Sequence, residues 1–213
     1  MHDVFASFES LGANCAFGFV QRAAGIETPS LLRWSMVTSP RALTAALDAD
    51  FAGLYGFDQL VPFNAEMVLD RGLGLAFHSA LRSAEVDGAL RFVASDEDRR
   101  DIHRFEAAKV MQQLAQFRAT LASGARFYVF HKYFGVLTPH EIAHLFAALR
   151  RRGPARLLVV SEADAAHPVG SVIAHVPGLL HGRIERFSPG DRADEVSLPE
   201  WETICRKALE MAP

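Results

Sequence analysis

The sequence predicts an α/β fold in which a central mixed sheet is flanked by helices, with a β-hairpin inserted in the N-terminal half. After residue 125, apolar strand-like runs alternate with a segment of helical periodicity, as in strand–helix–strand units. Half of the 213 residues are apolar and 22% are charged, which is the balance of a chain that buries a substantial core. We therefore expect residues 1–213 to form a single compact α/β domain.

The first elements are predicted from their ends. The segment Asp3–Ser10 has the composition of a short strand, and residues 15–24 have that of a helix, which Gly25 would end. A second helix should begin at Ser39 and Pro40, because serine is a favoured N-cap and proline suits the first helical position.

A β-hairpin is predicted from residues 73–81 and 89–93. Asp87 and Gly88 lie between these two stretches and supply a turn that tolerates positive φ. This pairing would place His78 in or beside a strand.

The C-terminal part alternates helices and strands. Asp96 is the expected cap of a long helix that Gly124 ends. The elements expected after it are a strand over 126–131, a helix over 139–152, strands over 156–160 and 183–187, and a closing helix over 198–211.

Charge and hydropathy exclude several classes of function. The net charge of −3 and the pI near 6.3 give no long-range attraction to nucleic acid or to anionic membranes. The run Arg150-Arg151-Arg152 closes a predicted helix, where cations complement the helix dipole. No apolar run approaches the ~20 residues of a membrane span, and the first residues lack the pattern of a signal peptide. We expect a cytoplasmic protein with two free cysteines and no nucleic-acid or membrane partner.

Cys15 is the strongest candidate for a reactive group. It follows a glycine-containing turn and falls at a predicted helix start, where partial positive charge favours the thiolate and lowers the cysteine pKa. A nucleophilic role needs an imidazole base, while Asn14 or a backbone N–H would donate to the oxyanion. Without such partners Cys15 is a small buried apolar residue, as we expect for Cys205 beside Trp201.

The region around Cys15 carries a family resemblance. Its most specific stretches are Ser10-Leu11-Gly12-Ala13-Asn14-Cys15, Phe17-Gly18-Phe19-Val20-Gln21-Arg22, and Leu31-Leu32-Arg33-Trp34 leading into Ser39-Pro40. Looser collinear matches are Phe77-His78, Arg104-Phe105, residues 127–130 and residues 156–160. These stretches are spread over residues 10–160, which is most of the chain. In them the sequence resembles the bacterial papain-like cysteine peptidase family.

The resemblance implies a site with Cys15 as nucleophile, His78 as base and Asn14 as oxyanion donor. Two positions depart from the family pattern, in which an acidic residue often follows both the histidine and the cysteine: this chain has Ser79 and Ala16 there. These departures leave open a degenerate site that binds without cleaving. His131, at the end of a predicted strand, is the second candidate base.

A motif in another part of the sequence suggests a zinc site as an alternative hypothesis. His140-Glu141-Ile142-Ala143-His144 matches H-E-x-x-H, in which two histidines one helical turn apart share Zn²⁺ and the glutamate acts as base. However, Thr138 and Glu141 also have the spacing of a capping box, and Ala147 and Arg150 stand where a G-x-x-H continuation would supply a third ligand. We therefore expect no metal and no cofactor.

The leading functional hypothesis is a thiol-dependent hydrolase or acyl transferase that acts on a peptide, amide or ester through a thioester. One alternative is a noncatalytic ligand-binding module associated with surface-polysaccharide enzymes, with a site built from Arg33, Trp34, Tyr133 and helix N-termini. The other is the zinc-dependent hydrolase. Motifs for dinucleotides, for P-loop phosphates and for a serine nucleophile elbow are absent from the sequence.

Overall fold

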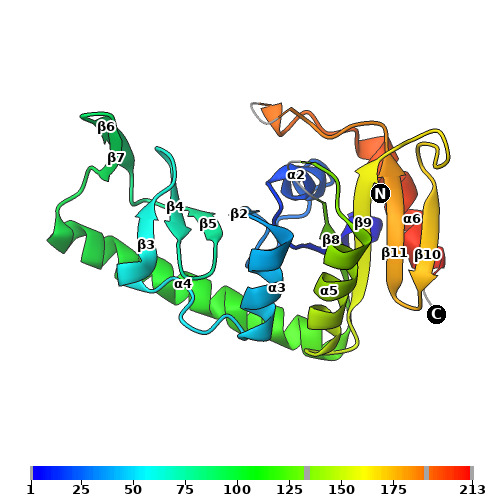
Figure 1. Cartoon of the computed structure of the whole chain (residues 1–213), viewed down its shortest axis with the longest axis horizontal. Coiled ribbons are helices and arrows are strands. Elements are labelled where there is room, and N and C mark those ends of the chain that lie inside the picture. The colour runs from blue at the N-terminus through cyan, green and yellow to red at the C-terminus, as the bar shows by residue number, and fades with distance from the viewer. Residues whose placement is uncertain (1, 132–134, 190–191, 212–213) are drawn as a thin grey trace.

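The computed structural model describes residues 2–131, 135–189 and 192–211, and it is an α/β structure. Its main sheet has five strands in the order β1-β8-β9-β11-β10 (Figure 1). Four of them run parallel and β10 pairs antiparallel at one edge. Their bounds are β1 (Phe8–Ser10), β8 (Phe127–Phe130), β9 (Arg156–Glu162), β10 (Val172–Val176) and β11 (Leu179–Ile184).

Helices cover both faces of this sheet. One face packs against α1 (His2–Ala6), α2 (Ala16–Ala23) and α6 (Leu198–Glu210), and the other packs against α3 (Pro40–Asp48), α4 (Asp96–Ser123) and α5 (Pro139–Arg150). Alternate residues of β9 serve the two sides: Leu158 and Val160 belong to the α6 core, and Leu157 and Val159 belong to the α5 core. This alternation follows from the two-residue period of a strand.

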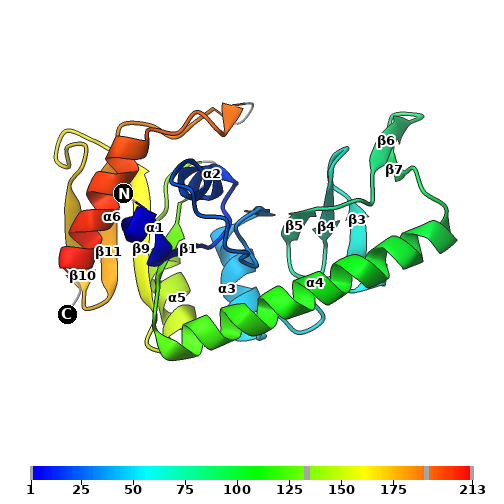
Figure 2. The same cartoon turned by 180° about the vertical axis from the view of Figure 1, so that it is seen from behind.

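The N-terminal half adds separate antiparallel sheets. The larger has the strand order β2-β5-β4-β3 and the smaller is the hairpin β6-β7. Helix α4 runs along the base of the molecule beneath these sheets and on to the main sheet (Figure 2). The remaining bounds are β2 (Ser35–Val37), a 3-10 turn (Phe57–Gln59), β3 (Leu60–Pro62), β4 (Met67–Asp70), β5 (Leu75–His78), β6 (Ser83–Val86) and β7 (Ala89–Phe92).

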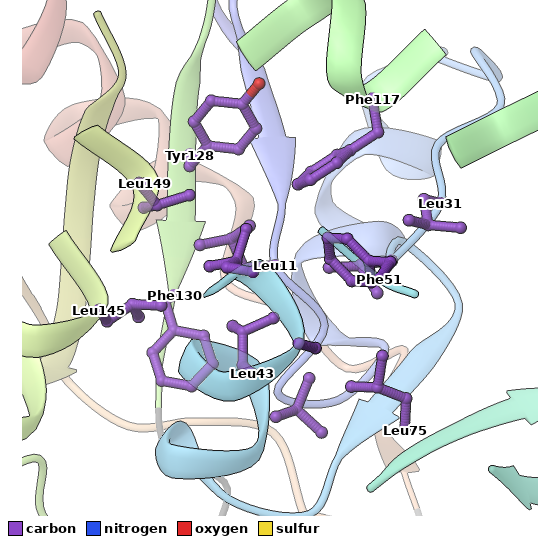
Figure 3. Packing of buried hydrophobic residues seen from close by; sticks show 14 of the residues in the cluster. Leu11, Leu31, Leu43, Phe51, Leu75, Phe117, Tyr128, Phe130, Leu145 and Leu149 are labelled. Atoms are coloured by element: carbon purple, nitrogen blue, oxygen red, sulfur yellow. The ribbon is translucent and has the colours of Figure 1, made fainter. Parts of the chain in front are cut away.

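One apolar core extends through both halves of the chain. Leu11 lies among Tyr128, Phe130 and Leu43, and the same cluster continues to Leu75 of the antiparallel sheet (Figure 3). All of these side chains are buried. Their burial is the main force that holds the two sheets together.

The connection after β1 is hydrogen-bonded to both sheets. The Leu11 N–H donates to the carbonyl of Val129 in β8, over 2.9 Å, and the Gly12 carbonyl accepts from the N–H of Val37 in β2, over 2.7 Å. Gly12 has a φ of +71°, in the left-handed region that glycine adopts without strain. We call this pair of adjacent residues the seam.

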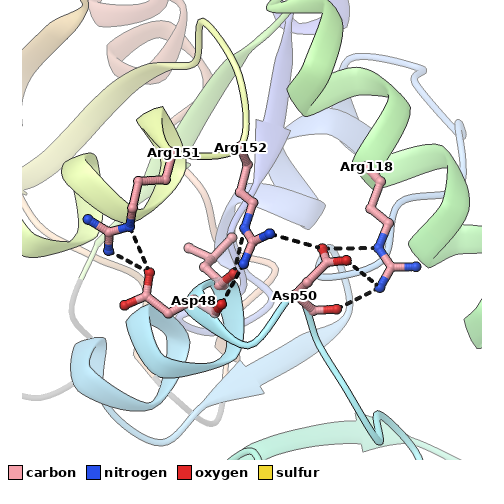
Figure 4. A network of polar contacts seen from close by, with 6 residues as sticks. Asp48, Asp50, Arg118, Arg151 and Arg152 are labelled. Atoms are coloured by element: carbon pink, nitrogen blue, oxygen red, sulfur yellow. Dashed lines mark hydrogen bonds and ion pairs between the residues drawn. The ribbon is translucent and has the colours of Figure 1, made fainter.

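Charged residues tie the helix ends together on the surface. Arg151 pairs with Asp48, while Arg152 contacts the Asp48 carbonyl and the Asp50 carboxylate (Figure 4). Arg118 of α4 donates to Asp50 as well. Arg151 and Arg152 thus join the end of α5 to the end of α3, and Arg118 joins α4 to the same place. The expected complement to the helix dipole stays a prediction.

Several predicted elements differ from the structure. The expected strand over Asp3–Ser10 is wrong in its first half, which forms α1; buried Val4, Phe5 and Phe8 suit a helical turn as well as a strand. The long helix begins after Ser95, whose hydroxyl accepts from Asp98 N–H, so Asp96 is the first helical residue and not the cap.

The turn of the predicted hairpin is correct, but the strand expected before it, over residues 73–81, does not belong to the hairpin. Asp87 and Gly88 have φ values of 53° and 74° and join β6 to β7. The strand that contains His78, β5, pairs instead with β4 and β2. At the other end of the chain, the last strand covers Leu179–Ile184, and the preceding edge strand β10 was not predicted.

In the part of the chain that the structure describes, no helix is both long and apolar enough to span a membrane.

Gly12→Ala should destabilise the fold more than a matched change in an open turn. A Cβ at Gly12 would collide with Ser35 Oγ and lie 2.6 Å from the Leu32 carbonyl oxygen, whereas a Cβ at Gly88 (φ +74°) meets no atom within 4 Å. We expect Gly12→Ala to lower the free energy of unfolding by about 3 kcal/mol and Gly88→Ala by about 1 kcal/mol. Urea denaturation measures both, and equal losses would contradict the packing assigned to the seam.

Candidate active site

Cys15 lies where the seam leads into a helix. Ser10 ends β1 and its hydroxyl accepts from the Gly12 N–H over 3.1 Å, which closes the turn. Asn14 Oδ1 then accepts from the Ala16 N–H over 2.8 Å. Cys15 is the N-cap residue of α2, so the structure places it at a helix start as the sequence predicts.

His78 reaches Cys15 from the antiparallel sheet. It is the last residue of β5, and its neighbour Phe77 is paired with Ser35 of β2, the strand that the seam holds. The His78 Nε2 atom lies 3.8 Å from the Cys15 Sγ atom although 63 residues separate them in the sequence. This is contact distance for a thiol and an imidazole, and apo enzymes often show such pairs slightly loose.

Both side chains line a cavity of about 530 Å³. Its walls come from α2, from the loop before β2, from the antiparallel sheet and from α4. The remaining lining residues are Phe19, Arg22, Ser30, Leu31, Trp34, Tyr55, Phe77, Glu106, Lys109, Val110 and Gln113. The volume and the aromatic walls suit a small organic group or a short peptide segment.

Burial opposes the activation expected for Cys15. It raises the pKa of the Cys15 thiol, and the charge of Arg22 only partly offsets this effect. The sequence predicted that the helix start lowers the pKa of Cys15. This prediction is wrong in direction, because the thiol is largely removed from water. At neutral pH the group is a thiol, so its attack requires transfer of the proton to a base.

His131 and Asn14 form a separate buried pair. His131 Nε2 lies 2.9 Å from Asn14 Oδ1, its ring stacks on Phe187, and burial lowers the pKa of His131 to about 4. The second candidate base thus contacts Asn14 and not the thiol. Asn14 is buried and is absent from the described cavity lining, so its oxygen orients the start of α2. Its oxyanion role stays a prediction.

A carboxylate from α4 holds the segment that follows His78. Glu106 Oε2 accepts from the hydroxyls of Ser79 (2.6 Å) and Tyr55 (2.8 Å), and Oε1 accepts from the Ala80 N–H (2.7 Å). Ser79 and Ala80, which follow His78 directly, are therefore held by a carboxylate from elsewhere in the chain. Charge-assisted bonds of this kind are stronger than neutral ones.

Tyr55 is itself tightly placed. Its backbone has a φ of +60°, and its N–H donates to Asp70 Oδ2 over 2.8 Å. The His103 ring stacks on the Tyr55 ring, and its Nε2 lies 2.8 Å from the Tyr55 carbonyl oxygen. Tyr55 and Glu106 were not predicted as site residues, because neither belongs to a local motif and Glu106 lies in a strongly charged helix.

Arg33 and Trp34, two residues of the predicted ligand site, have different surroundings. Arg33 is buried and donates to the carbonyls of Thr28, Gly18 and Ile26, so it fastens the loop before β2 onto α2. Tyr133 lies outside the described residues. Trp34 does line the Cys15 cavity, with the Arg22 guanidinium 4.3 Å from its ring centre.

The zinc motif occupies an ordinary helix start. Thr138 and Glu141 form a capping box at the beginning of α5, and the exposed His140 and His144 rings lie 3.9 Å apart. Across residues 2–131, 135–189 and 192–211, no group of three or more suitable side chains is arranged to hold a metal ion. Cys205 is buried in the α6 core, which raises its pKa well above the usual range and agrees with a packing role.

Comparisons of the whole chain with protein-family models, with curated proteins and with solved structures find no match.

Alkylation of Cys15 should depend on both pH and His78. Because burial raises the pKa of the thiol, we expect the iodoacetamide rate to keep increasing above about pH 9. His78→Gln should slow labelling near neutral pH by about tenfold, since the base is lost. Mass spectrometry of digested protein separates Cys15 from the buried Cys205. A plateau reached below neutral pH would contradict the raised pKa.

Glu106→Gln should loosen the support of His78. The amide replaces one acceptor oxygen by a donor, so at least one of the three donors around residue 106 loses its partner. We expect a loss of about 2 kcal/mol in unfolding free energy, against less than about 0.5 kcal/mol for the exposed control Glu97→Gln. Thermal and urea unfolding measure both changes. An unchanged free energy of unfolding in Glu106→Gln would contradict the structural role assigned to Glu106.

Proposed function

We propose that the chain is a cysteine-dependent hydrolase or acyl transferase that acts on a peptide, amide or ester. The observation that carries the proposal is the 3.8 Å approach of Cys15 Sγ and His78 Nε2 inside a cavity of substrate size. Independent segments supply the two groups, so the local sequence does not require their meeting. The resemblance to bacterial papain-like cysteine peptidases, in which Cys15 and His78 match the nucleophile and the base, supports the same assignment.

In the first half-reaction, His78 takes the Cys15 proton as the sulfur attacks the carbonyl carbon of the substrate. We assign stabilisation of the resulting oxyanion to the backbone N–H of Cys15, at the positive end of α2, because Asn14 is buried and is absent from the described lining of the cavity. The C–N or C–O bond then breaks, and the leaving group takes the proton from the imidazolium. The product of this step is a thioester on Cys15.

In the second half-reaction, His78 removes a proton from water, whose oxygen attacks the thioester carbonyl. The C–S bond breaks, the acid leaves, and the imidazolium returns its proton to sulfur. An amine or alcohol in place of water gives acyl transfer by the same steps. No group other than substrate and water is consumed.

The position of Glu106 favours a catalytically active site over a degenerate site that binds without cleaving. Family members often carry a carboxylate directly after the histidine, and here Glu106 lies against Ser79 and Ala80, the two residues that follow His78. We assign Glu106 a positioning role, exerted through the backbone of residues 79 and 80. A cytoplasmic location fits the two free thiols, which a reducing compartment preserves.

Loss of either Cys15 or His78 should abolish turnover without unfolding the protein. With p-nitrophenyl esters and a mixed fluorogenic peptide library as substrates, we expect Cys15→Ser and His78→Ala to reduce kcat by about 10³-fold. Cys15 is only partly buried and serine has nearly the same volume, so we expect a stability change below about 1 kcal/mol for the serine variant.

The exposed control His144→Ala should keep full activity, which also tests the zinc alternative. Activity that survives Cys15→Ser but not His144→Ala would overturn the proposal. Activity lost only together with the folded state would assign Cys15 to packing.

A further inference from the structure

A second cavity of about 480 Å³ lies on the main sheet, over β11 and β10 and beside the start of α5. None of the residues that line the Cys15 cavity lines this one. Its lining combines apolar side chains with an arginine, a serine, an aspartate and three histidines. The lining residues are Val136, Leu137, Pro139, Ile142, Ala143, Ser161, Asp164, His167, Ile173, His175, Leu179, His181 and Arg183. We call it the β11 cavity.

A β-bulge turns one imidazole toward another in this wall. The pairing of β10 with β11 matches Ile173 with His181 and Ala174 with Leu180, and then shifts so that Val176 faces Leu179. His175 is the extra residue at this shift, and its ring centre lies 5.7 Å from that of His181. Bulges commonly redirect a side chain beside a binding site.

The inner imidazole is held as a neutral polar group. His181 is buried, and its Nε2 atom lies 2.9 Å from the Ser161 hydroxyl oxygen. Burial is the main cause that lowers the pKa of His181 to about 4, and the neighbouring Arg183, His175 and His167 add to it. A neutral imidazole and a hydroxyl both donate hydrogen bonds without bringing a charge of their own.

Arg183 supplies the fixed positive charge. Its Nη1 donates to the Glu162 carbonyl over 3.0 Å and lies 3.4 Å from Asp164 Oδ2, while its buried Nε has no hydrogen-bond partner among the described residues. Asp164 is engaged by His167 Nδ1 (2.9 Å) and by the N–H groups of Ala166 and His167. The carboxylate thus orients the cation and one imidazole, and the guanidinium contributes to the cavity lining.

We propose that the β11 cavity binds a small organic oxyanion, a phosphate monoester or a carboxylate carried on an apolar body. The oxyanion would accept from Arg183, His175 and Ser161, and the apolar body would lie on Ile142, Ile173 and Leu179. Anions favour sites where several donors converge on a cavity with low access to water. The proposal is independent of the chemistry at Cys15.

Binding is tested by titrating the full chain with phenyl phosphate, benzoate or the uncharged benzyl alcohol. The NMR shifts of the histidine rings and of the backbone report the binding. We expect phenyl phosphate or benzoate to shift the His175 and His181 signals and to bind at least about tenfold more tightly than benzyl alcohol. Binding of the phosphate alone assigns the site to phosphate esters, and binding of benzoate alone assigns it to carboxylic acids.

Variants then locate the site. His175→Gln at the exposed bulge and Arg183→Gln should each weaken binding by about tenfold, while His140→Gln, an exposed imidazole outside the cavity, should leave it unchanged. Because Arg183→Gln removes a partly buried cation, its stability is measured by urea unfolding. If that variant does not fold, the affinity of His175→Gln tests the proposal. Equal affinity for benzyl alcohol, no shift at His175 and His181, or an unchanged affinity in His175→Gln would overturn the proposal.

Discussion

Backbone groups of two adjacent residues, Leu11 and Gly12, join the main sheet to the larger antiparallel sheet. The Leu11 N–H is bonded to the main sheet, and the Gly12 carbonyl is bonded to β2 of the antiparallel sheet. Leu11 is fully buried, and Gly12 leaves no room for a side chain against Leu32 and Ser35. Cys15 follows three residues later on one side of this seam, and His78 extends from the strand paired with β2 on the other side. These backbone hydrogen bonds thus position the two chain segments that carry the thiol and the imidazole.

The burial of Cys15 makes its thiol harder to ionise. Removing Cys15 from water raises the pKa of its thiol, which lowers the thiolate population that an exposed helix start would favour. A close base compensates for this effect only if its position is maintained. Glu106 meets that need indirectly, because its carboxylate binds Ser79 and the Ala80 N–H next to His78. Glu106 of α4 therefore helps to build the candidate site, although it does not contact the sulfur.

The sequence predicted the parts of the fold that local signals determine. Helices with clear caps, such as those after Ser39 and Thr138, and the apolar strands β8 and β9 lie close to their expected positions. Cys15 at a helix start also followed from local pattern. Strand partners did not, because the Asp87-Gly88 turn specifies that a hairpin closes there but not which apolar run precedes it. The choice of β4 and β2 as neighbours of β5 depends on tertiary packing.

The polar partners of the site were the least predictable. Glu106 acts from a helix 28 residues after His78, and the orientation of Asn14 toward His131 joins segments 117 residues apart. Burial, which reverses the expected pKa shift of Cys15, is likewise a property of the assembled cavity. Such features depend on how the two sheets meet at the seam, and no local periodicity encodes that arrangement.

The most direct test of the account is the mass of the protein during turnover. The chain is mixed with a slowly hydrolysed activated ester, quenched in acid and digested, and the acyl group is located by tandem mass spectrometry. We expect one acyl group per chain, on Cys15, that is released by hydroxylamine as a thioester and is lost in Cys15→Ser. Acylation of another residue at equal rate, or turnover with no acyl group on Cys15 at any time, would contradict the central claim that this thiol is the nucleophile.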